Sequence, residues 1–412
     1  MREAKAAMAK IEAEEQAKLA EQQEEQRRTT HDFFALTEAY LKADDHKNGS
    51  FSYDHIRSFK VLVRCVCRWV EFRKWSTSQA DFFFDIDNIT ADDIRSLFDY
   101  IKNEHSLQKK HPKFFSKVIG KYPAALQGSK YQFKIEQRGD NTLIKLKRKL
   151  KAFFTWLHKR GITTNDPFKG IAIGTEKFSA PYYLSVEERN RIADYDLSAI
   201  PKLERQRDIF VFQCLIGCRV GDLLGLTEDL IDDKGFLRYV DHKTKDERNK
   251  KMVVVPLTEQ ALHLINKYRG VDTKGRLFPF ISKQKYNEAI KEVLSRVGIE
   301  RIVQVRNPLT GEMERVNIAD KITSHIARKT FTAAAYREVK DPNIVCKMTG
   351  HIEGSKAFTR YNNIEDEVLA SVVKSESFLG KIDTAKAEVI KMVESLNDEQ
   401  LEKVKAYINT LL

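Results

Sequence analysis

The sequence has few of the features that mark membrane, secreted and zinc-binding proteins. No stretch approaches the roughly 20 consecutive apolar residues that a membrane-spanning helix requires, and the N-terminus is charged, unlike a signal peptide. Five cysteines are present, but Cys65-x-Cys67 is too closely spaced for a zinc knuckle, and no second ligand pair stands near it. We therefore expect a soluble, cytoplasmic protein with reduced thiols and no bound metal.

Positive charge is present in excess and is concentrated in one region. The chain of 412 residues has a net charge of +12, and residues 101–170 alone hold 17 Lys and Arg against four Asp and Glu. Clustered cations bind the phosphates of nucleic acids by displacing counterions. A solvated helix face is also rich in lysine, but a window that holds the whole excess favours an anionic partner. The length predicts two or three domains.

The N-terminal part has a helical pattern. Residues 1–30 form a charged lead without a sustained heptad, and residues 31–174 are expected to form a helical DNA-binding domain. One helix is predicted within residues 57–72, and another over Ala91–Asn103 with Thr90 as its N-cap. The apolar stripe of the first comprises Phe59, Leu62, Val63, Val66 and Val70. Residues 111–139 are expected to form an irregular basic insertion.

A third predicted helix has a core face and a cationic face. Asn141 is expected to cap its N-terminus and Gly161 to end it. Its apolar stripe comprises Leu143, Leu146, Leu150, Phe153 and Leu157. The rest of its surface carries Lys145, Lys147, Arg148, Lys149 and Lys151. We expect these five cations to lie along a DNA backbone.

A second domain, residues 185–380, is expected after a polar linker over residues 175–184. Ser185 and Glu188 form a capping box that would open its first helix. Residues 236–240 and 252–257 are expected to pair as strands, and residues 302–318 to form a second hairpin. Residues 381–412 hold two amphipathic segments, 384–396 and 398–411, the second with a capping pattern of Asn397 and Gln400. The predicted fold class is therefore mainly α with a small antiparallel β-sheet.

Six residues of this second domain could act together on a phosphodiester. Nucleophilic cleavage requires neutralisation of charge on the phosphoryl oxygens, an aligned nucleophile and a proton for the leaving oxygen. Arginine suits the first task because its guanidinium can bind two phosphate oxygens and keeps its charge. The candidates, in chain order, are Arg219, Lys243, His325, Arg328, His351 and Tyr361.

The first two candidates lie at predicted turns. Arg219 follows Gly217 at a break between two helical runs, where a helix start can present both an arginine and free N–H groups to phosphate. Arg219 could equally be a surface arginine paired to Asp222. Lys243 lies on the turn between the two predicted strands and is preferred because it directly follows the first strand. Its competitors on the same turn are Lys245, Lys250 and Lys251.

The other four candidates lie toward the C-terminus. His325 and Arg328 are three residues apart, so they share one face of a helix that Ser324 could cap. His351 follows a glycine that ends a predicted helix over residues 343–349. Tyr361 would need neighbouring cations, since a phenol with a pKa near ~10 is a weak nucleophile at neutral pH. Either histidine could instead be an ordinary core or capping residue, and Tyr361 could be a core aromatic residue.

The segments LIGCRVGDLLGL, HKTKDERNKKMVVVPL, SHIARKTF and TGHIEGSKAFTRY together resemble the tyrosine recombinases, the lambda-integrase-like family. The basic insertion, with its HPKFF…KYP stretch, looks most like integrases of Bacteroides-type mobile elements, a looser similarity. The family pattern at the first arginine is Thr-Gly-x-Arg, followed three residues later by Glu. This sequence departs from it, with Ile216-Gly217-Cys218-Arg219 followed by Asp222. The spacing from His351 to Tyr361 is also one residue longer than usual. The resemblance implies a SAM-like core-binding domain joined to a mixed α+β catalytic domain.

The resemblance implies a site-specific DNA recombinase that integrates or excises a mobile element. Tyr361 would form a 3′-phosphotyrosyl intermediate, Lys243 would protonate the leaving 5′ oxygen, and strands would exchange through a Holliday junction. The implied partners are double-stranded attachment sites, a homo-tetramer on DNA, and host DNA-bending or excision proteins, in the nucleoid and away from membranes. No cofactor is implied, and the sequence has neither an acidic metal cluster nor a glycine-rich phosphate loop.

Two other functions share parts of this pattern. A type IB topoisomerase uses the same chemistry but relaxes supercoils without bringing two duplexes together. A non-catalytic DNA-binding regulator descended from the family would be expected to lack one of the six residues, and all six are present.

Overall fold

The computed structural model describes residues 2–46, 49–118, 135–241, 252–339, 341–351, 389 and 392–411. The chain divides into two compact units: unit 1 is residues 1–180 and 302–317, and unit 2 is residues 181–301 and 318–412. The described elements of unit 1 are α1 (Arg2–Thr30), α2 (Phe33–Lys42), α3 (Tyr53–Thr77), α4 (Ala91–Lys110), α5 (Pro112–Val118), α6 (Asp140–Lys159), β3 (Ile302–Arg306) and β4 (Met313–Asn317).

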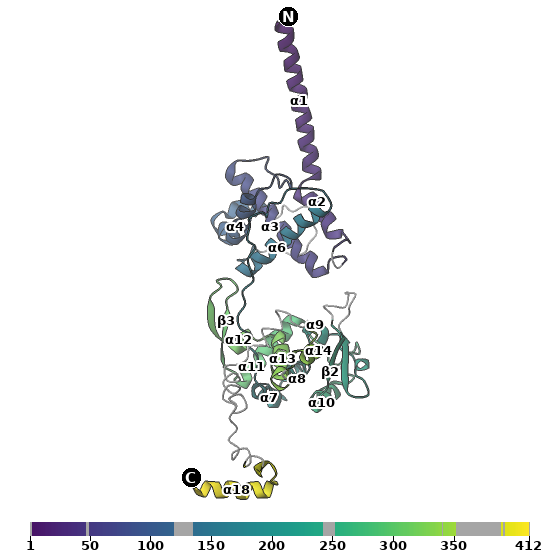
Figure 1. Ribbon diagram of the computed structural model, residues 1–412, viewed down its shortest axis with the longest axis vertical. Coiled ribbons are helices and arrows are strands. Elements are labelled where there is room, and N and C mark those ends of the chain that lie inside the picture. The colour runs from purple at the N-terminus through teal and green to yellow at the C-terminus, as the bar shows by residue number, and fades with distance from the viewer. Residues whose placement is uncertain are drawn as a thin grey trace. The chain divides into compact units, whose positions relative to one another are not determined.

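Unit 2 is built from short helices and one pair of strands. Its described elements are α7 (Val186–Asp194), α8 (Pro201–Ile216), α9 (Val220–Leu223), the 3-10 helix η2 (Glu228–Leu230), β1 (Phe236–Val240), β2 (Met252–Pro256), α10 (Glu259–Tyr268), α11 (Lys283–Val297), α12 (Ile318–Lys321), α13 (Ser324–Val339), α14 (Pro342–Thr349) and α18 (Asp398–Leu411). Each unit thus has one two-stranded antiparallel sheet among helices (Figure 1). The predicted fold class is confirmed.

The predicted helices of unit 1 form where the sequence places them. All five residues of the predicted α3 stripe are buried, and the helix opens with the Ser52 hydroxyl accepting from the His55 N–H. Thr90 caps α4 through a full capping box with Asp93, although the helix runs on to Lys110. The apolar stripe of α6 is buried as predicted. The periodic spacing of apolar residues therefore predicted the helices whose side chains form this core.

Two predictions for this region are wrong. Asn141 does not cap α6, which begins one residue earlier with Gly139 as its N-cap. The Asn141 amide instead donates to the Lys177 carbonyl at 2.7 Å and accepts from the Lys177 N–H at 2.9 Å. Residues 112–118 are helical (α5) rather than irregular, opening on a proline that suits a first helical turn. Residues 119–134 of the predicted insertion lie outside the described residues.

The core of unit 1 is aromatic and contains a buried ion network. The rings of Phe33 and Phe84 are 4.9 Å apart, centroid to centroid. Glu104 is fully buried and accepts from Arg68 Nε at 2.5 Å and from Arg138 Nη1 at 2.8 Å. A buried carboxylate is tolerated only when it is paired in this way. The network fixes α3 and α4 to the segment that leads into α6.

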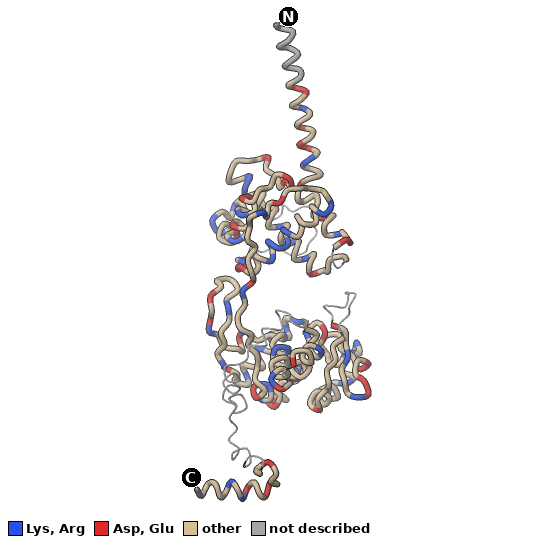
Figure 2. The backbone as a smooth tube through the Cα atoms, viewed as in Figure 1, with Lys and Arg blue, Asp and Glu red and all other residues tan. Residues whose placement is uncertain are grey.

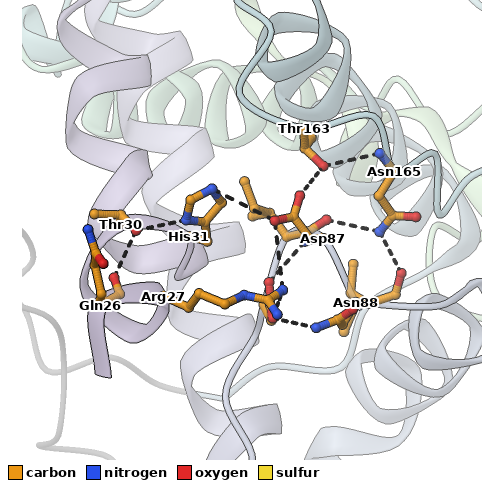
Figure 3. Close-up of polar contacts among 11 residues, drawn as sticks. Gln26, Arg27, Thr30, His31, Asp87, Asn88, Thr163 and Asn165 are labelled. Carbon is orange, nitrogen blue, oxygen red and sulfur yellow. Dashed lines mark hydrogen bonds and ion pairs between the residues drawn. The ribbon is translucent and has the colours of Figure 1, made fainter. Parts of the chain in front are cut away.

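The C-terminal end of α1 is attached to the body of unit 1 by polar contacts (Figure 3). Arg27 Nη2 donates to Asp85 at 2.7 Å, and His31 Nε2 lies 3.7 Å from Asp87. The hydroxyl of Thr163 donates to the same Asp87 at 2.5 Å. The charged lead is thus a continuous helix joined at one end to the helical unit, and its described part carries both signs of charge (Figure 2).

The core of unit 2 is built around α8. From Gln206 to Ile216 every residue of this helix is buried, so it is enclosed on all sides by its neighbours. α7, α10, α11 and α13 pack against it. The predicted capping box of Ser185 and Glu188 opens α7. β1 and β2 pair as predicted, with Val240 opposite Met252.

The second hairpin and the last helix also form as the sequence predicts. β3 pairs with β4, and the turn forms as the Asn307 side chain accepts the N–H groups of Leu309 and Thr310. Asn397 and Gln400 form the reciprocal cap of α18. Most of the helix predicted over residues 384–396 lies outside the described residues. Among the described helices, none is long and apolar enough to cross a bilayer.

Candidate functional site

The turn that carries Arg219 depends on a glycine. α8 ends at Gly217, which has a left-handed backbone (φ +66°), and Arg219 is the N-cap of α9. A Cβ on Gly217 would overlap the ring of Phe331 on α13, so only glycine allows this approach. The buried amide of Gln213 donates to the Cys218 carbonyl at 3.0 Å and holds the turn from inside. Gly217 and Gln213 thus determine where the Arg219 side chain projects from the core.

Arg328 lies at the centre of the site. Its side chain is 1% exposed on α13, and Nη1 donates to the Gly217 carbonyl at 3.1 Å. Nη2 lies 3.2 Å from Nε2 of His351, which follows α14. A buried guanidinium is therefore shared between the end of α8 and the end of α14. These contacts bring Arg328 and His351 together and place both beside the turn that carries Arg219.

The contacts of Thr349 show which atom of His351 donates a hydrogen bond. The Thr349 hydroxyl lies 2.7 Å from the Val345 carbonyl, to which it must donate its one proton. The same oxygen lies 2.8 Å from His351 Nδ1, so Nδ1 carries a proton and donates to it. Nη2 of Arg328 lies 3.2 Å from Nε2 and 3.3 Å from Nδ1 of the same ring. Thr349 and Arg328 together hold the ring in this orientation.

His325 lies on the same helix as Arg328 and is exposed to solvent. Packing around the ring and, to a smaller extent, the nearby cations Lys329, Arg328 and Arg219 together lower its pKa to about 4. At neutral pH the imidazole is uncharged and can accept a proton or a hydrogen bond.

We expect the pKa of His325 to rise toward its ordinary value in an Arg219→Gln protein, because one of the three nearby cations is lost. NMR titration of the ring protons measures this directly. His55 in unit 1 is the control: packing also lowers its pKa to about 4, but with Lys149 and His46 as its charged neighbours. A titration of His325 that does not change in the variant would contradict the proximity of Arg219.

The same shift sets a pH dependence of stability. In the unfolded chain a histidine takes up its proton near ~6.5, whereas His325 in the folded protein does so at about 4. Between these values the unfolded state binds more protons, so acidification through this window lowers the free energy of unfolding.

The carboxylate that pairs with Arg219 was not predicted. Asp241, the residue after β1, is 1% exposed and accepts from Arg219 Nη1 in an ion pair. Asp222, expected in that role, is also buried (6% exposed). A single Asp after a strand carries no distinctive signal in a sequence. Only the fold shows that residues 219 and 241 meet.

Two of the six candidates cannot be placed. Lys243, with its competitors, and Tyr361 lie outside the described residues. Ser324 is the first residue of α13 rather than a residue before it, and its N–H donates to the Asn287 side chain at 2.8 Å. The structure brings together Arg219, His325, Arg328 and His351, all in unit 2.

The five cations predicted on α6 have different environments. Lys145 and Arg148 both pair with Glu176, at 3.3 and 2.5 Å. The ammonium of Lys147 lies over the ring of Phe98, 5.3 Å from its centroid. Lys149 is half-buried, which lowers its pKa, and Lys151 is exposed. The cationic surface is therefore partly occupied by a carboxylate of the chain itself.

Comparison with known proteins gives a consistent result. Residues 183–367 match the model of the phage integrase family, a range that spans all six candidate residues. Tyrosine recombinase XerC of Thermodesulfovibrio yellowstonii is 22% identical over 229 residues, covering 56% of this chain and 73% of that protein. Tyrosine recombinase XerD of Oceanobacillus iheyensis is 25% identical over 235 residues, covering 55% and 73%.

Solved structures share the fold. A lambda integrase dimer bound to a COC′ core site superposes with a TM-score of 0.50 at 12% identity, covering 81% of this chain and 95% of that one. The Tn1549 transposon integrase in complex with circular intermediate DNA gives a TM-score of 0.50 at 13% identity, covering 84% and 99%.

Proposed function

Because this chain belongs to the phage integrase family of tyrosine recombinases and is a site-specific recombinase, we propose that it integrates or excises a mobile element. It does so by cutting and rejoining DNA through a 3′-phosphotyrosyl intermediate and a Holliday junction. The observation that carries this proposal is the convergence of Arg219, His325, Arg328 and His351 at one place in unit 2. Two guanidiniums with two imidazoles suit a phosphodiester better than any other common substrate.

In the proposed reaction the phenolic oxygen of Tyr361 attacks the scissile phosphorus. The bond from phosphorus to the 5′ oxygen breaks, and Lys243 gives that oxygen its proton. The 3′ phosphate remains as an ester of Tyr361. A 5′ hydroxyl of the partner strand then attacks this ester and releases the tyrosine. One phosphoester bond is formed for each one broken, so no external source of energy is consumed.

The described side chains have separate parts in this scheme. Arg219 and Arg328 neutralise the charge that develops on the non-bridging oxygens, which is the largest contribution expected of such a site. His325, uncharged at neutral pH, can accept the tyrosine proton because the arriving phosphate favours its protonated form. His351 orients Arg328, since their nitrogens lie 3.2 Å apart.

We further propose that the protein works as a homo-tetramer on two attachment sites, aided by host DNA-bending or excision proteins. The lambda integrase structure with the shared fold is a dimer on its core site, which supports assembly on DNA. Residues 31–174 are proposed to be the core-binding domain, with residues 175–184 as the linker and residues 185–380 as the catalytic domain.

A covalent-trap assay tests the proposed function. Nicked duplexes built from the DNA that flanks the gene are incubated with the protein, and the adduct is digested and sequenced by mass spectrometry. A nucleotide ester of Tyr361 at a 3′ phosphate is the expected product. Transfer of the trapped strand to a second duplex separates a recombinase from an enzyme that only relaxes supercoils. Binding without any adduct, on these duplexes and on a nicked Holliday junction, would contradict the proposal.

The cations of α6 are proposed to contact the DNA backbone, and Glu176 competes with phosphate for two of them. We expect Glu176→Gln to raise duplex affinity about two- to fivefold, the modest effect of an exposed ion pair. Lys145→Ala and Arg148→Ala should each reduce the slope of affinity against salt by about one. Filter binding at several salt concentrations measures both effects.

Glu292→Gln in unit 2 is the matched control, because Glu292 also pairs with an exposed arginine, Arg296, on a helix surface. It should leave the affinity unchanged. Equal effects of Glu176→Gln and Glu292→Gln would show that general charge, rather than competition at α6, is responsible.

A further inference from the structure

The carboxylate of Asp241 occupies an unusual position beside the site. It lies directly after β1, two residues before Lys243, and is 1% exposed. Its Oδ2 accepts from Arg219 Nη1. The same oxygen would lie 3.1 Å from a Cβ placed on Gly350, so it packs against the residue that precedes His351. One buried carboxylate therefore contacts the Arg219 turn and the end of α14.

The packing around Gly350 makes this contact rigid. Gly350 ends α14 in a left-handed conformation (φ +65°), and its N–H donates to the Cys346 carbonyl at 2.7 Å. A Cβ there would also come within 2.9 Å of Val253 on β2. Any larger residue would push β2 or Asp241 away. The close approach of α14, β2 and Asp241 thus holds the carboxylate in one place.

We propose that Asp241 is a positioning residue, which fixes the guanidinium of Arg219 so that its remaining N–H donors face the scissile phosphate. The proposal rests on the proposed function. A guanidinium has five N–H donors in a fixed plane, so one strong bond at Nη1 determines the direction of the others. Arg219 is 28% exposed, whereas Asp241 is 1% exposed. The phosphate can therefore reach the arginine but not the carboxylate that would repel it.

Asp241 also offsets part of the positive charge that surrounds His325. Arg219, Arg328 and Lys329 all lie close enough to lower the pKa of His325. These cations repel one another, and the ion pair of Arg219 with Asp241 compensates one of their positive charges. Pre-orientation of this kind lowers the cost of aligning the donors when the transition state forms.

The test is a double-mutant cycle on single-turnover cleavage of a nicked suicide duplex. Asp241→Asn keeps the shape and a neutral acceptor oxygen but removes the charge, and cleavage should slow up to about 100-fold. In an Arg219→Lys background the same change should slow cleavage less than about threefold, because the group it orients is already altered. DNA binding and the melting temperature should stay near those of the parent in both cases.

Asp232→Asn is the matched control, because Asp232 pairs with Arg238 at the other end of β1 and is part of no proposed site. It should not change the rate. Equal losses from Asp241→Asn in both backgrounds, or no loss at all, would overturn the proposal and leave Asp241 a purely structural residue.

A second measurement separates this proposal from the proposed function. If the wild type forms no adduct, the proposed function fails, and crystal structures of the wild type and the Asp241→Asn protein then decide the positioning role. A guanidinium of Arg219 that moves away from residue 241 in the variant supports the role. An unmoved guanidinium overturns it.

Discussion

Tyr361→Phe is expected to abolish formation of the covalent protein–DNA adduct while leaving DNA binding intact. The change removes the phenolic oxygen that would become the ester, and no water molecule can supply a protein-linked intermediate in its place. The cations that bind phosphate are untouched, so affinity for the duplex should be unchanged. Gel analysis of the trapped adduct, alongside filter binding of the same preparation, measures both quantities.

Tyr407→Phe is the appropriate control, because Tyr407 is the next tyrosine after Tyr361 and is 66% exposed on α18. It should form the adduct at the wild-type rate. Persistence of the adduct in Tyr361→Phe would move the nucleophile to another residue, and loss in the Tyr407 variant would move it to the C-terminal helix.

Arg328→Ala is expected to slow single-turnover cleavage by 10² to 10³, equivalent to about 3–4 kcal/mol of transition-state stabilisation. The substitution removes a charge-stabilising donor and also leaves the Gly217 carbonyl and His351 Nε2 without the contacts that Arg328 makes. Because the side chain is buried, the alanine protein can also lose stability. Arg328→Lys is therefore the more informative variant: it keeps the charge but cannot bond two phosphate oxygens in one plane, so cleavage should still be clearly slowed.

Stability and chemistry are separated by measuring the melting temperature and duplex affinity of each variant. Arg296→Ala serves as the control, since Arg296 is a half-exposed helix arginine that pairs with Glu292. Its rate should match the wild type. A normal cleavage rate in Arg328→Lys would show that charge alone is sufficient at this position, and a normal rate in Arg328→Ala would remove Arg328 from the site.

Local sequence patterns predicted the helices, the hairpins and their caps. The stripe of α3 and the capping boxes at Thr90 and Ser185 are properties of residues three or four apart, so neighbours in the chain decide them. Asn141 shows where such reasoning fails. Its sequence context suits a cap, but Lys177, far along the chain, takes both hydrogen-bonding groups of its amide.

Local patterns also predicted part of the candidate site. His325 and Arg328 share a helix face, which spacing alone shows. The pairing of Arg219 with Asp241 joins the end of α8 to the end of β1, and no local pattern indicates that these ends meet. The sequence likewise did not indicate that Glu176 pairs with two of the cations on α6. Glu176 reaches them only because the chain leaves the helix and folds back along it.

The β3–β4 hairpin has a consequence for dissecting the protein. Although its sequence lies between α11 and α12 of unit 2, the hairpin belongs to unit 1, where the Pro308 carbonyl lies against the backbone of Gly139. A single cut near residue 180 therefore does not separate two complete units. A fragment beginning there would carry the hairpin without its neighbours, whereas excising residues 302–317 and joining residue 301 to residue 318 would remove a self-contained loop. The Ile318 N–H already donates to the Arg301 carbonyl at 2.9 Å, so the two ends that must be ligated are adjacent.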